Sequence, residues 1–174
     1  DISRFRVLIT TDLKEEEPLQ MLEQGEVPKL EALQLHNGTV YRWNRACYGI
    51  TDGKPHLRIE NRILPSGPST VDQIANAAFW FGLVSGLASR YDDIAEVMAF
   101  DDAKSNFIAA ARHGLASQFT WLDGRQVPAH ELVLDDLLPL AEEGLRGSDI
   151  DEEDIERYLT IIEQRVRTRK TGSQ

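Results

Sequence analysis

The chain has 174 residues, of which 41% are hydrophobic, and it carries a formal net charge of −10. This length allows one domain with a sizeable core, and the longest apolar run is too short to span a bilayer. The negative charge argues against binding to nucleic acids or anionic membranes, because both need a basic surface. The single cysteine, Cys47, excludes an internal disulfide and is typical of the cytoplasm. We expect no signal peptide, because DISRFRVLITTDL lacks an apolar core region and a cleavage site.

The first 65 residues carry mainly strand signals, with short helical segments between them. The predicted elements, in chain order, are a strand at residues 4–10, a helix at 15–24, a helical turn at 28–35, a strand at 39–44 and a strand at 58–62. Turn signals lie at His36-Asn37-Gly38 and at Asp52-Gly53. We expect the last two strands to be antiparallel neighbours.

The remaining residues are predominantly helical. A helix at residues 71–87, capped by Ser69 and Thr70 with Gln73 in capping-box spacing, is apolar on every side, which predicts a central position. The later predicted elements are helices at 91–98 and 102–113, a hairpin at 119–127 turning at Asp123-Gly124, a helix at 129–143 interrupted at Pro139, and a helix at 151–168. The apolar stripe of the last helix consists of Ile155, Tyr158, Leu159, Ile162 and Val166.

Charge is unevenly distributed along the chain. Residues 37–62 contain five Lys or Arg and two acids, whereas residues 131–163 contain twelve acids and two Arg. A basic segment inside an acidic protein suggests that residues 37–62 bind an anionic small molecule. The same distribution also fits direct pairing between the basic segment and the acidic helices, and both interpretations stay open.

Three charged residues, Arg58, Glu60 and Arg62, alternate along the predicted strand at 58–62. A period of two places them on one face, with neighbours about 7 Å apart. On the other face, Leu57, Ile59 and Ile63 are expected to pack on a core. A carboxylate on a strand can bind Mg²⁺, and each flanking guanidinium group can bind a phosphate through two parallel hydrogen bonds. The alternative is a solvated face with cross-strand ion pairs.

Other residues near this strand are weaker candidates. Arg42 and Arg45 flank Trp43 and are suited to a phosphate or a substrate carboxylate. His36 and His56 are open to a metal-binding role or to plain polar contacts. Cys47 has no second cysteine nearby, which argues against a nucleophile. The chain has no Walker loop, no GxGxxG and no GxSxG motif.

Two segments resemble a known family: GTVYRWNRACYG and HLRIENRILPSGPSTVDQIANAAFWFGL. They are similar to the C-terminal half of the glutamate–cysteine ligase family, a carboxylate–amine ligase type related in fold to glutamine synthetase. The resemblance covers residues 1 to about 87. It implies a cytoplasmic, ATP- and Mg²⁺-dependent ligase of the kind found in glutathione biosynthesis, with glutamate and an amine such as cysteine as substrates. The glutamate γ-carboxylate would be phosphorylated by ATP and then attacked by the amine.

The resemblance also implies residue roles. Glu60 would bind a Mg²⁺ that bridges the nucleotide phosphates, and Arg62 would stabilise the transferred phosphoryl group. Arg58 would hold a nucleotide phosphate or order Glu60. Arg45 would bind the nucleotide or, together with Arg42, the substrate carboxylate.

We therefore expect an α+β fold in one domain spanning residues 1–174. A small antiparallel sheet within 1–65 would pack on the central apolar helix, with the other helices of 69–168 bundled around it. We expect the chain to be the C-terminal part of a larger ligase, with little or no activity alone, and a homo-oligomer stays open. The alternatives are a non-catalytic regulatory or assembly module that binds an anion, and a purely structural role.

Overall fold

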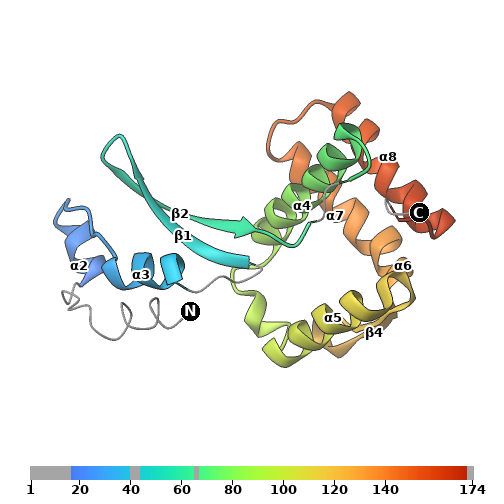
Figure 1. Cartoon of the computed structure of the whole chain (residues 1–174), viewed down its shortest axis with the longest axis horizontal. Coiled ribbons are helices and arrows are strands. Elements are labelled where there is room, and N and C mark those ends of the chain that lie inside the picture. The colour runs from blue at the N-terminus through green and yellow to red at the C-terminus, as the bar shows by residue number, and fades with distance from the viewer. Residues whose placement is uncertain (1–16, 40–43, 65–66, 172–174) are drawn as a thin grey trace. The chain divides into compact units, whose positions relative to one another are not determined.

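The computed structural model describes residues 17–39, 44–64 and 67–171. The fold is α+β, as predicted, with helices and two small antiparallel sheets among these residues (Figure 1). The chain divides into two compact units, Asp1–Pro65 and Ser66–Gln174. In the described part of the chain, no helix is both long and apolar enough to cross a membrane.

The described residues of the first unit form two short helices and one hairpin. These elements are α2 (Pro18–Glu23), α3 (Glu31–Thr39), β1 (Asn44–Thr51) and β2 (Lys54–Asn61). The two strands pair in antiparallel register. The predicted turn at Asp52-Gly53 is confirmed, since both residues have positive φ, 51° and 74°, as a type I′ hairpin turn requires.

The prediction of a turn at His36-Asn37-Gly38 is wrong, because α3 continues through all three residues. Asn and Gly are weak helix formers, so contacts to β1 must offset their propensity. The Asn37 side chain donates a hydrogen bond to the Ala46 carbonyl oxygen at 2.6 Å. The predicted strand at 4–10 and residues 40–43 of the predicted strand at 39–44 lie outside the described residues.

The second unit is built mainly from helices. Its elements are α4 (Thr70–Arg90), η1 (Ile94–Glu96), α5 (Phe100–His113), η2 (Gly114–Ala116), β3 (Gln118–Thr120), η3 (Leu122–Gly124), β4 (Gln126–Pro128), α6 (Ala129–Glu131), η4 (Leu132–Leu137, a π-helix), α7 (Leu138–Arg146) and α8 (Glu152–Thr168). The core cluster consists of Ala141, Leu145, Ile155 and Leu159, against which Ala78, Phe79, Leu83 and Leu138 pack.

Several local predictions for this unit are confirmed. Ser69 is the N-cap of α4, and its hydroxyl oxygen accepts from the Asp72 amide at 3.3 Å. The capping-box spacing of Thr70 and Gln73 is not used, because Thr70 is already the first residue of the helix. The β3–β4 hairpin turns at Asp123-Gly124, which have positive φ values of 56° and 73°. Four of the five residues in the predicted stripe of α8 are buried, namely Ile155, Leu159, Ile162 and Val166.

Other predictions need correction. The expected helix at 91–98 is only the 3₁₀ turn η1, which begins where the Asp93 side chain accepts from the Ala95 amide at 2.8 Å. The expected helix at 129–143 extends to Arg146, because α6, the π-helical turn η4 and α7 follow one another without a gap. Its predicted interruption at Pro139 is confirmed, since the π-helical turn ends two residues before Pro139, which cannot donate a helical hydrogen bond.

Helix α4 is not buried on all sides. Its buried residues are small, namely Ala75, Gly82 and Gly86. A Cβ built on Gly82 or Gly86 would lie within 3.0 Å of α7 backbone atoms, and one on Gly144 would meet the backbone of α4. The two helices therefore pack backbone to backbone, while Phe81 on another face of α4 is 57% exposed. Small residues decide which face of this apolar helix is buried.

Candidate anion-binding face of the β1–β2 hairpin

The β1–β2 register gathers charged residues on one face of the hairpin. Arg45 pairs with Glu60, and Cys47 pairs with Arg58. Because side chains alternate between the faces of a strand, all four project from the same face. The prediction that Arg58 and Glu60 share a face is therefore confirmed. Arg62 lies one residue beyond the end of β2, so the strand period does not fix its direction.

Arg45 is held from two sides. Its Nε donates to Oε2 of Glu60 in an ion pair, and its Nη1 donates to the carbonyl oxygen of Asn37 in α3 at 2.5 Å. Cys47 Sγ lies 3.8 Å from the same Glu60 Oε2. These contacts lock the Arg45 guanidinium and the Glu60 carboxylate together, with the buried Cys47 beside them.

The electrostatics of the pair keep Glu60 ionised. The hydrogen bond from Arg45 is the largest influence and lowers the pKa of Glu60, and the positive charges of Arg45 and Arg62 act in the same direction. Desolvation opposes them by raising the pKa. The hydrogen bond to Glu60 likewise raises the pKa of Arg45. The face therefore carries a fixed carboxylate among guanidinium groups.

This shift predicts a pH dependence of stability. A carboxyl whose folded-state pKa is lowered stabilises the fold above its unfolded value, 4.5 for Glu60, and that contribution disappears as the pH falls through the folded-state value. We expect the wild-type protein to lose its advantage over a Glu60→Gln variant when urea unfolding is compared near pH 7 and near pH 3. The Glu60 side chain is 39% exposed, so the effect is small. An unchanged difference in unfolding free energy would contradict the assignment of the pair.

Gly49 leaves room for two further side chains on this face. A Cβ built on Gly49 would lie 2.7 Å from Cε1 of His56 and 2.9 Å from Nη1 of Arg58. The imidazole and the guanidinium therefore lie over the bare backbone of β1. His56 Nε2 is also 3.1 Å from the hydroxyl of Thr51. The resulting row of Arg45, Arg58 and His56 can donate several hydrogen bonds to an anion.

The described residues supply one carboxylate, that of Glu60, for a magnesium ion at this face. No three His, Cys, Asp or Glu side chains come together among them as a metal-binding group. Both described contacts of the Glu60 carboxylate use Oε2, which leaves Oε1 for another partner. Mg²⁺ is commonly held by one or two carboxylates, with water and phosphate oxygens as its other ligands. Glu60 fits that limited role, and its assignment as a metal ligand stays a prediction.

The opposite face of the hairpin is exposed within the described structure. Leu57 is 69% exposed, Ile59 is 55% exposed and Ile63 is 37% exposed. These three side chains are therefore not buried among the described residues, and Ile63 follows the end of β2, so the strand period does not fix its direction. The packing of this face on the helix at 71–87 stays a prediction.

Two residues of the site were not singled out in the sequence, Asn37 and Gly49. Asn37 was interpreted as part of a turn, so no role in the site was expected for it. Gly49 had a usable signal, because Arg45, Cys47 and Gly49 alternate along β1 just as Arg58 and Glu60 do along β2. Arg42, a candidate ligand of the substrate carboxylate, lies outside the described residues.

Comparisons with known proteins leave the function of this face to be inferred from its chemistry. No family model matches the chain, and neither a curated protein nor a solved structure matches it. The resemblance to the glutamate–cysteine ligase family therefore depends on the two segments at residues 38–49 and 56–83.

Proposed function

We propose that this hairpin face binds the phosphate groups of ATP in a carboxylate–amine ligase of the glutamate–cysteine type. The observation that carries the proposal is the row of Arg45, Arg58 and His56 on one face, in which Arg45 pairs with Glu60 and the other two lie over the bare backbone of Gly49. Guanidinium groups fixed by neighbours bind phosphate oxygens with geometric specificity. The two segments that resemble the ligase family contain all of these residues.

The proposed reaction has two steps. A γ-carboxylate oxygen of glutamate forms a bond to the γ-phosphorus of ATP while the bond to the ADP oxygen breaks. The amine nitrogen of the second substrate then bonds to the carbonyl carbon of the acyl phosphate, inorganic phosphate leaves from that carbon, and the amine loses a proton. The products are ADP, phosphate and a γ-glutamyl amide. Transfer of this kind depends on positioning and on stabilisation of negative charge.

Each residue of the face has a role in this scheme. Arg58 binds a nucleotide phosphate, and Arg62 stabilises the transferred phosphoryl group. Arg45 is held against Glu60 and orients that carboxylate, in addition to its role toward nucleotide or substrate. Through Oε1, Glu60 would hold a Mg²⁺, which neutralises phosphate charge when it is bound. Arg42 is the further candidate for the substrate carboxylate.

The proposal extends to the context of the chain. We infer that it forms the C-terminal part of a larger cytoplasmic ligase, whose remaining metal ligands and nucleotide contacts lie elsewhere. The 174-residue chain is then expected to bind ATP while releasing little or no ADP in the presence of glutamate, cysteine and Mg²⁺. Rapid ADP release by this chain would contradict that division of the site.

Binding of ATP tests the role of the face directly. Arg58→Ala removes a charge-assisted contact and should weaken Mg-ATP binding, measured by titration calorimetry, at least about tenfold. Arg112→Ala removes an exposed arginine of α5 in the other unit and serves as the matched control, with binding unchanged. Equal affinities of the wild type and Arg58→Ala would show that the face is not the phosphate site.

A second candidate is a regulatory or assembly module that binds an anion without catalysis. It is favoured by the pairing of Glu60 with Arg45 and by the lack of a three-ligand metal group among the described residues. The two functions differ in what the complete protein does. The ligase forms a γ-glutamyl amide and consumes ATP, whereas the regulatory module binds an anion and never turns over.

A further inference from the structure

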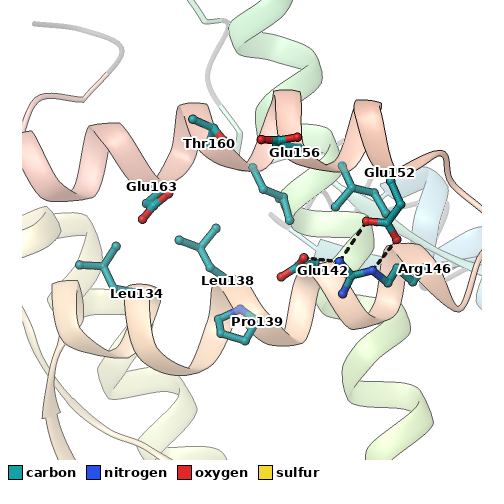
Figure 2. Close-up of a pocket in the computed structure, with 11 residues that line it drawn as sticks. Leu134, Leu138, Pro139, Glu142, Arg146, Glu152, Glu156, Thr160 and Glu163 are labelled. Carbon is teal, nitrogen blue, oxygen red and sulfur yellow. Dashed lines mark hydrogen bonds and ion pairs between the residues drawn. The ribbon is translucent and has the colours of Figure 1, made fainter.

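A groove of about 480 Å³ runs between α7 and α8 in the second unit (Figure 2). Apolar side chains, among them Leu138, Ile155 and Leu159, form part of its lining. Carboxylates form much of the rest: Glu142 of α7 and Glu152, Glu156 and Glu163 of α8. The groove therefore combines apolar lining with acidic side chains.

Arg146 is the single basic residue in the lining of this groove. Its Nε lies 2.5 Å from Oε1 of Glu152, and its Nη2 lies 2.5 Å from Oε1 of Glu142 (Figure 2). These bonds tie the end of α7 to the first turn of α8, so two of the four glutamates share one guanidinium and the three groups together carry one negative charge. Glu156 and Glu163 add further carboxylates in the second half of the groove.

The two remaining glutamates differ in their partners. Glu163 pairs with Arg167 one turn further along α8, at 2.8 Å. Glu156 is exposed, and its carboxylate has no hydrogen bond or ion pair with any other described residue. Thr160 lies between them in the lining. An α-helix rises about 1.5 Å per residue, so these three side chains extend over about 10 Å along the groove.

The spacing of these carboxylates indicates which kind of ligand the groove can bind. The carboxylates are spread along a helix, and no three of them come together as a metal-binding group among the described residues. A linear series of cations fits better than one ion. Lys and Arg side chains have an aliphatic stem that covers apolar surface and a charged head that reaches acidic groups. The excess of twelve acids over two arginines in residues 131–163 attracts such a ligand from a distance.

We propose that the α7–α8 groove is a docking surface for a basic segment of a partner protein. The stems of its Lys or Arg side chains lie on Leu134 and Leu138, which line the groove and are only partly buried, and their charged heads pair with Glu156 and Glu163. This function is separate from anion binding at the hairpin, since all of its residues belong to the second unit. Charge complementarity gives the partner its specificity, and apolar contact with the lining contributes affinity.

The test uses the whole chain and a fluorescent amphipathic peptide built only of leucine and lysine. Fluorescence anisotropy at low salt should show saturable binding that weakens steeply as salt is added. A peptide with glutamate in place of lysine should not bind. Failure of the lysine peptide to bind, or equal binding of both peptides, would overturn the proposal.

Substitutions on α8 locate the binding. Glu156→Lys should weaken binding of the lysine peptide about tenfold, because an attraction becomes a repulsion. Glu153→Lys is the matched control, since Glu153 is exposed on the same helix but does not line the groove, and it should change affinity less than threefold. Equal weakening by both changes would indicate attraction to general negative charge and would refute the groove as the site.

A gain-of-function variant keeps the test independent of folding defects. Thr160→Glu places a carboxylate between Glu156 and Glu163 and should tighten peptide binding about threefold. Circular dichroism checks that α8 stays helical, because like charges four residues apart destabilise a helix slightly. Unchanged or weaker binding by a helical Thr160→Glu protein would contradict the proposal.

Discussion

A Gly144→Ala protein is expected to unfold at a clearly lower temperature than the wild type. A Cβ at this position would lie within 3.0 Å of the Gly82 carbonyl oxygen and of the Gly86 amide nitrogen. Both obstructing atoms belong to the backbone of α4, so no side-chain rotation relieves the clash. Helices α4 and α7 must separate, and their close contact is lost along the interface.

Two opposing contributions determine whether Gly144→Ala stabilises or destabilises the protein. Alanine is favoured over glycine inside a helix by about 1 kcal/mol, which would stabilise α7 if the space were open. Overpacking a well-packed interior costs about 1–3 kcal/mol, and more when the backbone has to move. We expect a net loss of about 2 kcal/mol in the free energy of unfolding, measured by urea denaturation.

Gly147→Ala provides the matched control three residues further along the chain. Its added Cβ would come no closer than 3.4 Å to the neighbouring Glu143 carbonyl oxygen, an ordinary contact distance. The control should therefore keep nearly wild-type stability. Similar stabilities for the Gly144 and Gly147 variants would show that the two helices do not pack as closely as described.

Under the proposed ligase function, the second large effect is expected for Glu60→Gln in the larger enzyme that the proposal describes. The amide keeps the size of the side chain but removes the negative charge that orients Arg45 and that would hold Mg²⁺. Loss of one group that stabilises a phosphoryl-transfer transition state typically costs about 10²–10³ in turnover. We expect at least about a hundredfold decrease in the rate of ADP release with glutamate and cysteine present.

Stability separates this effect from a folding defect. Glu60 is partly exposed and its ion pair is screened by solvent, so the variant should unfold at nearly the wild-type urea concentration at neutral pH. The regulatory alternative predicts altered anion binding in a protein that never turned over. Turnover by Glu60→Gln at the wild-type rate would remove Glu60 from the ligase mechanism.

Much of the fold followed from local sequence signals. The Asp52-Gly53 and Asp123-Gly124 turns need positive φ, which these residues tolerate, so their positions were predictable. The stripe of α8 followed from helical periodicity. The same local reasoning failed at α3, where contacts with β1 extend a helix through Asn37 and Gly38. A local preference of about 1 kcal/mol or less per residue is reversed by such tertiary contacts.

The candidate site also has features that local sequence predicts and features that only tertiary pairing decides. Alternation along one strand was sufficient to place Arg58 and Glu60 on one face, because a period of two is a property of the strand itself. The pairing of Glu60 with Arg45, fifteen residues earlier, depends on the register between two strands. Residue types alone do not fix a register, since a one-residue slip would place Arg45 on the opposite face.

The sequence by itself determined the turns, the helical stripe, the alternating charges and the acidity of the C-terminal third, because each depends on neighbours in the chain. Only the tertiary structure decided that Arg45 holds Glu60, that glycines set the contact of α4 with α7, and that α7 and α8 enclose an acidic groove. Those features depend on how distant segments meet, and their free energies come from packing and charge pairing across the fold.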